Sequence, residues 1–422
     1  MRKSQIFIGS SHPELGKLIS DRLGVEPAPC KIYSFSNGET GCDIGVSVRD
    51  THAIIILGSA DLINDRIMEL LVLISGCRGG SASKITCVIP MFPYSKQSKM
   101  KKHRGAITAR MLANLITKAG ADHVITMDLH AGQMQGFFSK PVDNLTAGPT
   151  LARWIRQNVP DYRSAVVVSK NPGGTKRVTA LADALKINFA MIHTDRRRVT
   201  ARPVSEAFPA NEPQLDENSD DDDSQNPMSG SMISTFGEAD EETSDSCGRL
   251  GVHSSNIHIA RVLGGHVVTD DAVPTLDEPS EAAVAGLGGS GEAINSDDEE
   301  VDYTKEQVIA LVGDVKGRAA IILDDMIDRA DSFIAAAEHC RLSCGAKAVY
   351  IVATHGVFSQ GSLQDLSACP YIDHIVVTNT YPNAQSSPKL HVIDISGLLA
   401  ECIRRNHNGE SISTLFEQLE VV

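Results

Sequence analysis

Short apolar runs rich in valine and isoleucine recur along the chain, and stretches with the spacing of amphipathic helices separate them. Apolar runs without alternation are typical of strands buried on both faces, as in parallel sheets covered by helices. The pattern therefore predicts an α/β fold. The first four or five runs fit one domain and the others a second of the same type; they are residues 6–9, 53–57, 85–89, 124–127, 165–168, 189–192, 319–323, 349–353, 375–378 and 390–393.

Residues 199–304 break this rhythm. They include 24 acidic and three basic residues, no lysine and only three aromatic residues. Such a composition buries too little apolar surface to offset chain entropy, so we expect most of this segment to be disordered. An island at residues 256–268, interrupted by Gly264 and Gly265, predicts either a hairpin or a motif that orders on a protein partner. Ser219 and Ser296 precede acidic runs, which fits either phosphorylation by an acid-directed kinase or an unmodified linker.

The net charge of -14 conceals a division of the chain. The segment 199–304 carries -21, which leaves +7 on the other 316 residues. The acidic total argues against a nucleic-acid partner. No apolar run of about 18 residues is present, so we expect no membrane span, and the first residues lack the apolar core of a signal peptide. Nine cysteines without a C-x-x-C pair predict reduced thiols in a cytoplasmic protein.

Two adjacent carboxylates, Asp324 and Asp325, follow a buried apolar run and precede a helical stretch that contains Phe333. In open α/β sheets, ligands bind beyond the carboxyl ends of the strands. Vicinal carboxylates there can accept hydrogen bonds from a ribose diol, and the following helix offers N–H groups to a phosphate. The alternative is that the acids only end a strand and cap the helix.

Several longer motifs point to a family. They read YSFSNGET at 33–40, FPYSKQ at 92–97, MDLHAGQMQGFF at 127–138, GDV at 313–315, VVTNT at 376–380 and AECIRR at 400–405. Together they closely resemble the ribose-phosphate diphosphokinase family, also called phosphoribosyl diphosphate (PRPP) synthetases. The resemblance covers residues 1–198 and 305–422, so 199–304 is a long acidic insertion.

The resemblance implies two phosphoribosyltransferase-type, Rossmann-like domains with parallel sheets. Residues 1–148 would form the N-terminal domain on the ATP side. Residues 149–198 and 305–405 would form the C-terminal domain on the ribose-phosphate side, and 406–422 would pack back on the N-terminal domain.

The family reaction transfers diphosphate from ATP to ribose 5-phosphate and gives PRPP and AMP for nucleotide biosynthesis. The resemblance implies Mg²⁺ as cofactor, and paralogous subunits as partners in a hexamer-based hetero-oligomer. Catalysis of such a transfer consists mainly of positioning and of cancelling phosphate charge. Mg²⁺ needs few protein carboxylates for this because it keeps several waters.

The resemblance also assigns roles to single residues. Phe35 would stack on adenine, with Asn37 and Glu39 reaching it from a neighbouring subunit. The implied phosphate contacts of ATP are Lys96, Gln97 and His130, and the implied catalytic residues are His130 and Arg196. The implied ribose-phosphate contacts are Asp324, Asp325, Asp328 and Ser332; the Mg²⁺ ligands are Asp128, His130 and Asp143; and a regulatory phosphate would meet Ser47, Arg49 and Arg104.

Four departures from the family pattern fall in this predicted site. Where the ribose-phosphate loop normally reads Asp-Thr-small-Gly-Thr, residues 328–332 read Asp-Arg-Ala-Asp-Ser. Asp331 brings a negative charge to the expected phosphate position, or caps the helix in place of the phosphate. Asn171 and Ser139 replace acids near the metal, and Thr194 replaces a catalytic lysine that would stabilise the transferring group.

These departures leave two hypotheses. The chain is an active diphosphokinase in which nearby Arg and Lys side chains substitute for the missing groups. Alternatively, it is a weakly active or inactive regulatory subunit that works with a catalytic paralogue, and its insertion contacts other proteins.

Overall fold

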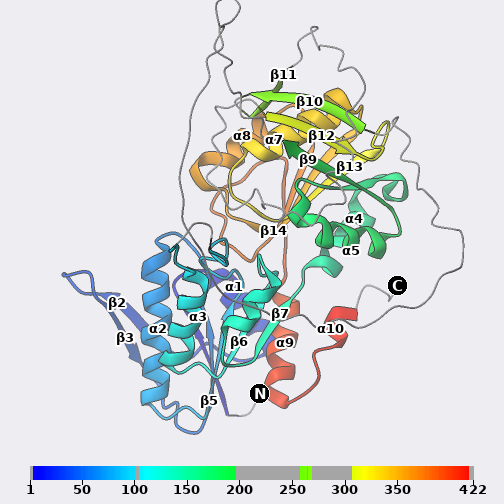
Figure 1. Cartoon of the computed structure of the whole chain (residues 1–422). Coiled ribbons are helices and arrows are strands. Elements are labelled where there is room, and N and C mark those ends of the chain that lie inside the picture. Colours follow the sequence, from blue (N-terminus) through cyan, green and yellow to red (C-terminus); the bar gives the residue numbers. More distant parts are fainter. Residues whose placement is uncertain (1–2, 101–103, 196–256, 264, 269–306, 418–422) are drawn as a thin grey trace, which may run out of the picture. The chain divides into compact units, whose positions relative to one another are not determined.

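The computed structural model describes residues 3–100, 104–195, 257–263, 265–268 and 307–417, and it contains two large sheets (Figure 1). The first has five strands in the order β1-β4-β5-β6-β7. The second has nine strands in the order β11-β10-β12-β9-β8-β13-β14-β15-β16. The predicted α/β class with parallel sheets is therefore confirmed.

All neighbours in the first sheet are parallel. Its strands are β1 (Ser4–Ile8), β4 (His52–Ile56), β5 (Lys84–Ile89), β6 (His123–Met127) and β7 (Val142–Leu145). Successive side chains of a strand point to opposite faces. Ile54 and Ile56 accordingly pack with Leu15 of helix α1 (Pro13–Leu23), whereas Ile55 packs with helices α2 (Ile63–Gly79) and α3 (Thr108–Ala119) on the other face.

The central part of the second sheet is also parallel. Its strands are β9 (Asn188–Asp195), β8 (Val166–Ser169), β13 (Ala319–Ile327), β14 (Ala348–Gly356), β15 (His374–Thr378) and β16 (Leu390–Ile393). One face packs against α4 (Gly148–Asn158) and α5 (Thr175–Leu185). The other face packs against α7 (Asp331–Glu338) and α8 (Ser362–Ala368).

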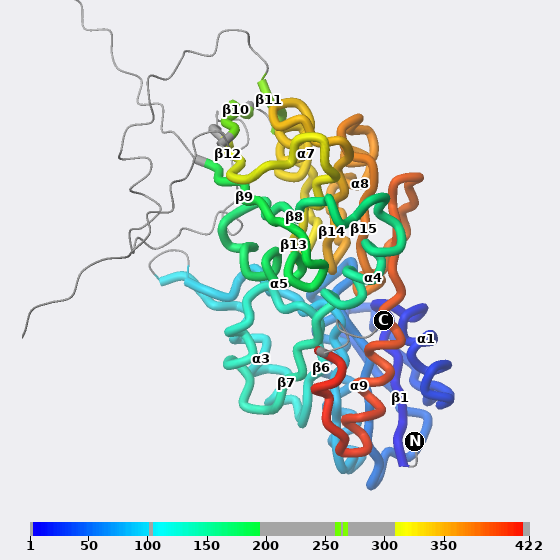
Figure 2. The backbone as a smooth tube through the Cα atoms, turned by 90° about the vertical axis from the view of Figure 1, so that its right-hand side faces the viewer, coloured from blue at the N-terminus to red at the C-terminus, as the bar shows by residue number. Residues whose placement is uncertain are grey.

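The C-terminal helix α9 (Ser396–Asn408) runs beside α1 (Figure 2). Arg22 Nε donates to Ser396 Oγ at 2.6 Å at its beginning. Near its end, Lys84 Nζ donates to Asn406 Oδ1 at 2.8 Å. The chain thus returns from the second sheet to the first, and the short helix α10 (Thr414–Glu417) follows.

Part of the acidic insertion is built into the second sheet. Strand β10 (Ile257–Leu263) pairs antiparallel with β12 (Gln307–Val312) and with β11 (His266–Val268). Of the two interpretations of the island at 256–268, the structure therefore shows the hairpin. Val262 is buried against the core beneath α7. The rest of the insertion, with Ser219 and Ser296, lies outside the described residues.

Two further sequence expectations concern cysteines and membranes. The eight cysteines in the described ranges are all free thiols, and Cys247 lies outside those ranges. Within the same ranges, no helix has the length and apolar character that a membrane span needs.

Candidate functional site

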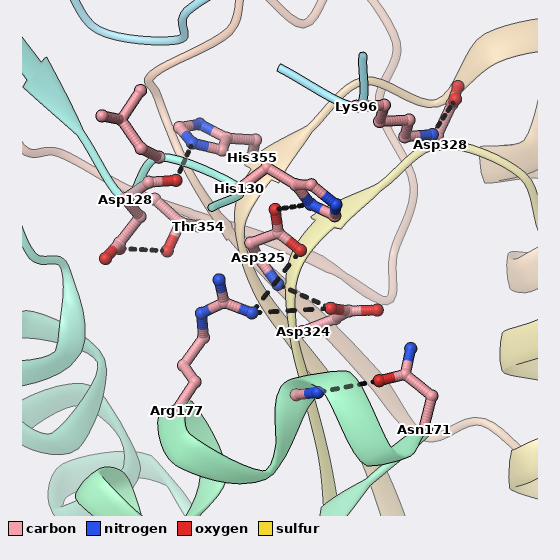
Figure 3. Close-up of polar contacts among 12 residues, drawn as sticks. Lys96, Asp128, His130, Asn171, Arg177, Asp324, Asp325, Asp328, Thr354 and His355 are labelled. Carbon is pink, nitrogen blue, oxygen red and sulfur yellow. Dashed lines mark hydrogen bonds and ion pairs between the residues drawn. The ribbon is translucent and has the colours of Figure 1, made fainter. Parts of the chain in front are cut away.

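The end of β6 places the DLH motif. Asp128 follows the strand in a left-handed backbone conformation, with φ 39°, and its N–H donates to Leu145 O at 2.8 Å. Its Oδ2 accepts hydrogen bonds from Ala147 N at 2.9 Å and from Thr354 Oγ1 at 2.6 Å. Because Thr354 belongs to β14, these contacts connect the carboxyl end of β6 to the second sheet (Figure 3).

His130 and Asp325 form a second connection between the sheets. His130 Nδ1 lies 2.8 Å from Asp325 Oδ2, and Arg177 of α5 lies 3.5 Å from Asp325 Oδ1 (Figure 3). Burial by itself raises the pKa of Asp325, but the His130 hydrogen bond and the charges of Arg177 and His130 outweigh it and hold this pKa well below its ordinary value. Asp325 is therefore a buried carboxylate kept ionised by cationic neighbours.

Asp324, beside it, contacts the basic side chains of Lys170 and Arg177. Lys170 Nζ lies 2.9 Å from Asp324 Oδ2, and Arg177 lies 3.7 Å from Asp324 Oδ1. Lys170 also donates to Ser332 Oγ at 3.2 Å and lies over the ring of Phe333, 4.2 Å from its centroid. The lysine thus spans from the end of β8 to the first turn of α7.

Lys96 and Asp328 make the third connection. Lys96 Nζ donates to Asp328 Oδ2 at 2.6 Å (Figure 3). Burial raises the pKa of Asp328, yet the hydrogen bond and charge of Lys96 lower it overall. Motif residues from the two halves of the sequence therefore meet at one edge, as expected when ligands bind beyond the carboxyl ends of parallel strands.

Comparisons with known proteins identify this arrangement. Residues 4–120 match the N-terminal domain of ribose phosphate pyrophosphokinase, and residues 293–417 match the phosphoribosyl synthetase-associated domain. Ribose-phosphate pyrophosphokinase 1 of Saccharomyces cerevisiae is 56% identical over 437 residues, which cover 99% of each chain. The chain belongs to the ribose-phosphate pyrophosphokinase family.

Two further relatives agree with this membership. Ribose-phosphate pyrophosphokinase 1 of Schizosaccharomyces pombe is 48% identical over 431 residues, covering 99% of this chain and 100% of the other. The crystal structure of phosphoribosylpyrophosphate synthetase from Mycobacterium smegmatis superposes with a TM-score of 0.67 at 27% identity, covering 97% and 100% of the two chains. The family predicted from the motifs is confirmed. Because both fungal pyrophosphokinases align over 99% of this chain, the alignments include its acidic insertion.

The residues assigned to adenine lie away from this edge within the chain. Phe35, Asn37 and Glu39 connect β2 (Cys30–Ser34) to β3 (Thr40–Ile44), in a hairpin that extends away beside α2 (Figure 1). The Phe35 side chain is half exposed and packs edge-on against Tyr33, with ring centroids 5.2 Å apart. Asn37 Oδ1 accepts from Glu39 N at 3.1 Å, which closes the turn.

The structure separates Asp143 from the other two predicted Mg²⁺ ligands. Its Cα pairs with Ile125 in the middle of β6, and its Oδ2 lies 3.2 Å from His123 Nε2. The neighbouring Asn144 is the residue of β7 that reaches the end of β6, where its Oδ1 accepts from Leu129 N at 3.1 Å. This contact with His123 is compatible with a structural role, and the role of Asp143 as an Mg²⁺ ligand stays a prediction.

The remaining predicted residues are more dispersed. Gln97 is exposed after the loop that carries Lys96. Ser47, Arg49 and Arg104 are also exposed, and their regulatory role stays a prediction. Arg196 lies outside the described residues.

The departures from the family pattern also have definite places. Asn171 is buried and its Oδ1 accepts from Gly174 N at 2.9 Å, so it closes the turn before α5. Asp331 is the first helical residue of α7 and not its cap, because Ala330 holds the cap position without a side-chain bond. Thr194 pairs with Ile309 between β9 and β12, and Ser139 is exposed.

Sequence motifs do not identify Thr354, His355 or Arg177 as site residues. His355 is fully buried with Nε2 3.1 Å from Met127 O, and burial lowers its pKa. Thr354 and His355 belong to the last residues of the buried strand β14, and polar residues at such a strand end are the available signal. Arg177 lies in helix α5, and nothing in the sequence around it indicates a site residue.

Proposed function

We propose that this chain is a subunit of an assembly that synthesises PRPP from ATP and ribose 5-phosphate. The observation that carries the proposal is the meeting of motif residues from both halves, His130 with Asp325 and Lys96 with Asp328. Transfer between two substrates requires their reacting atoms to be held about 3 Å apart. An edge built jointly by the two sheets suits that requirement.

In the proposed reaction, the 1-hydroxyl oxygen of ribose 5-phosphate forms a bond to the β-phosphorus of ATP. The bond from that phosphorus to the α,β-bridging oxygen breaks, AMP leaves, and the hydroxyl proton passes to water. Lys96, Gln97 and His130 would contact the ATP phosphates. Asp324 and Asp325 would accept hydrogen bonds from the ribose hydroxyls, so that binding orients the attacking oxygen.

Mg²⁺ would neutralise charge on the polyphosphate. Asp128 and His130, which both follow β6, are the side chains available to hold it. In the described part of the chain, no group of three or more His, Cys, Asp or Glu side chains is placed to bind a metal ion. This sparse set fits Mg²⁺, which commonly takes one or two carboxylates and completes its shell with phosphates and water.

The adenine side of the proposed site depends on a second subunit. The half-exposed Phe35 supports this view, since its aromatic face has room for a base. We infer that the hairpin carrying Phe35, Asn37 and Glu39 serves a neighbouring subunit in a cytoplasmic hetero-oligomer of PRPP synthetase paralogues. A further protein partner would bind the acidic insertion.

A second form of the proposal makes this chain a regulatory subunit with little activity of its own. Thr194 supports it, because a threonine supplies no positive charge where the family places its catalytic lysine. Asp331 supports it too, since a carboxylate in the ribose-phosphate loop repels an anion.

Release of AMP by the purified chain with ATP, Mg²⁺ and ribose 5-phosphate distinguishes the two forms. Turnover that disappears in Asp324→Ala means that the chain is active alone. No turnover alone, with activity restored by a paralogue, supports the regulatory form. Failure to form PRPP both alone and with every paralogue would contradict the proposal.

A further inference from the structure

Lys170 occupies an unusual place at the carboxyl edge of the second sheet. It directly follows β8, whose last residue, Ser169, pairs with Leu323 of β13. Asp324 is the next residue of β13, so the end of β8 delivers a cation beside this carboxylate. The Lys170 side chain is 14% exposed, so its ammonium is largely withdrawn from solvent.

This ammonium contacts a carboxylate, a hydroxyl and an aromatic ring. It lies 2.9 Å from Asp324 Oδ2, 3.2 Å from Ser332 Oγ and 4.2 Å from the centroid of the Phe333 ring. A carboxylate, a hydroxyl and an aromatic face together satisfy a desolvated lysine. Lys170 is therefore held in place, because moving its side chain away would break all of these contacts.

These partners coincide with the groups that the proposed function gives to the pentose phosphate. Asp324 would accept hydrogen bonds from the ribose hydroxyls, and Ser332 belongs to the loop that would meet the phosphate. An ammonium group has three N–H donors and can take the place of the hydroxyl donors of a sugar at the carboxylate. A pentose phosphate that enters must first displace the lysine.

The insertion hairpin covers the same turn of α7 from another side. Gly265, between β10 and β11, has φ 83°, and a Cβ added to it would lie 3.3 Å from Asp331 Cβ. Glu338, at the end of α7, fixes the hairpin: its Oε1 lies 2.8 Å from His266 Nδ1, and its Oε2 accepts from Val267 N at 2.7 Å. The beginning of α7 is thus approached by Lys170 and by Gly265.

We propose that Lys170 is a tethered occupant of the pentose-phosphate site and excludes ribose 5-phosphate from this chain's own site. The inference rests on the proposed function, because that function assigns Asp324 and Ser332 to the pentose. On this proposal, Lys170 is the residue that makes the chain a regulatory subunit with little activity of its own. Ribose 5-phosphate bound by the assembly would then be bound by the paralogous subunits.

Calorimetric titration of the full-length chain with ribose 5-phosphate tests this inference. Lys170→Ala removes the occupant, and Lys170→Met removes its charge while keeping an unbranched chain against Phe333. Both variants should bind ribose 5-phosphate at least about tenfold more tightly than the wild type. Lys170→Arg keeps the charge and should exclude the ligand as the wild type does. Thermal unfolding without ligand shows whether each variant is folded.

The matched control is Lys118→Ala, which removes one positive charge from an exposed position of α3 and should leave ribose 5-phosphate binding as in the wild type. The inference is overturned if the wild type binds ribose 5-phosphate as tightly as Lys170→Ala, or if folded Lys170→Ala and Lys170→Met bind no better. Weaker binding in these variants would make Lys170 a ligand-binding residue, which also overturns it.

A separate measurement distinguishes failure of this inference from failure of the proposed function. PRPP formation by the wild-type chain mixed with its paralogues tests the function and does not depend on the titration. If the mixture makes no PRPP while Lys170→Ala binds ribose 5-phosphate more tightly than the wild type, the proposed function fails and the role of Lys170 stands. If the mixture makes PRPP while the wild-type chain alone binds ribose 5-phosphate well, only the inference on Lys170 fails.

Discussion

His130 Nδ1 lies 2.8 Å from Asp325 Oδ2, so the end of β6 in the first sheet is paired with the end of β13 in the second. Asp325 is 3% exposed, and burial of an ionised carboxylate is tolerated only when partners compensate for lost water. His130 and Arg177 provide that compensation. The contact between the two sheets at this point therefore depends on Asp325 being ionised.

Replacing His130 by alanine should destabilise the fold. The change removes a hydrogen bond to a buried charge and leaves Arg177 as the basic neighbour at 3.5 Å, so the free energy of unfolding should fall by about 2 kcal/mol. The lowered pKa of Asp325 means that its pairing stabilises the fold above the ordinary carboxyl pKa of about 4, and that this contribution is lost as pH falls through the folded-state pKa.

Urea unfolding at neutral pH and below about pH 4 checks both parts of this prediction. The difference between the wild type and His130→Ala should be full at neutral pH and should shrink in acid. Asp50→Ala is the control, since Asp50 pairs with Lys3 on the exposed surface and its loss should hardly change the unfolding curve. An equal difference at both pH values would mean that His130 acts by packing alone.

Replacing Thr354 by valine should also cost stability, because the hydroxyl donates to Asp128 Oδ2 at 2.6 Å and valine has the same shape without the donor. We expect a loss of about 1 to 2 kcal/mol, as for a hydrogen bond to a charged group. Thr126→Val is a close control: Thr126 is equally buried, and its hydroxyl has no hydrogen-bond partner in the described part of the chain. Thermal unfolding should show Thr126→Val at or above the wild type, and a similar loss in both variants would contradict the assignment.

The strands show what the sequence can predict about the fold. Each of the ten apolar runs lies within or overlaps a strand. Interior strands such as β4 and β14 are covered by helices on both faces, so their residues must be apolar. The runs do not reveal β2, β3, β7 and β12. Strands β2 and β3 form a separate hairpin with mostly half-exposed or exposed residues, and β7 ends the first sheet. Strands β2, β3 and β7 therefore lack the uninterrupted apolar signal, whereas β12 has one at residues 308–312.

The candidate site shows a different limit of prediction from sequence. The acid pair at 324 and 325 and the DLH motif are visible in the sequence because chemistry demands those residues side by side. The contact of Lys170 with Asp324 depends on β8 lying next to β13, although strands β9, β10, β11 and β12 come between them along the chain. Strand order is a property of the whole sheet, so the motif around Asn171 predicts the turn and not the neighbour of its lysine.

His52 should make stability depend on pH. Its ring is buried, stacks on His407 with centroids 5.2 Å apart, and lies 2.7 Å from Thr86 Oγ1. Burial lowers the pKa of His52 to about 3, and the charges of Lys84 and His407 add to this. Because the folded-state pKa is lowered, the neutral ring stabilises the fold above the ordinary histidine pKa of about 6.5, and the contribution is lost as pH falls toward the folded-state value.

The expected loss from His52 is about 2 kcal/mol between neutral pH and about pH 5. His52→Gln removes the titrating ring, so its free energy of unfolding should change less over that interval than that of the wild type. Denaturant unfolding at several pH values measures both slopes. Identical slopes would mean that His52 is not responsible for the acid sensitivity.

Glu338 should hold the insertion hairpin on the enzyme body. It is buried, and its two oxygens bind His266 Nδ1 and Val267 N. Glu338→Ala removes both contacts and leaves β11 held by its pairing with β10 and by packing against α7, so the Val267 amide should exchange with solvent at least about tenfold faster. Hydrogen exchange read by mass spectrometry measures this, with Glu410→Ala as control because Glu410 is an exposed partner of Arg404 far along the chain.

Unchanged protection at Val267 would show that pairing with β10 suffices. Faster exchange that extends into the first turn of α7 would place the insertion in contact with the proposed pentose site, since Gly265 packs on Asp331 there.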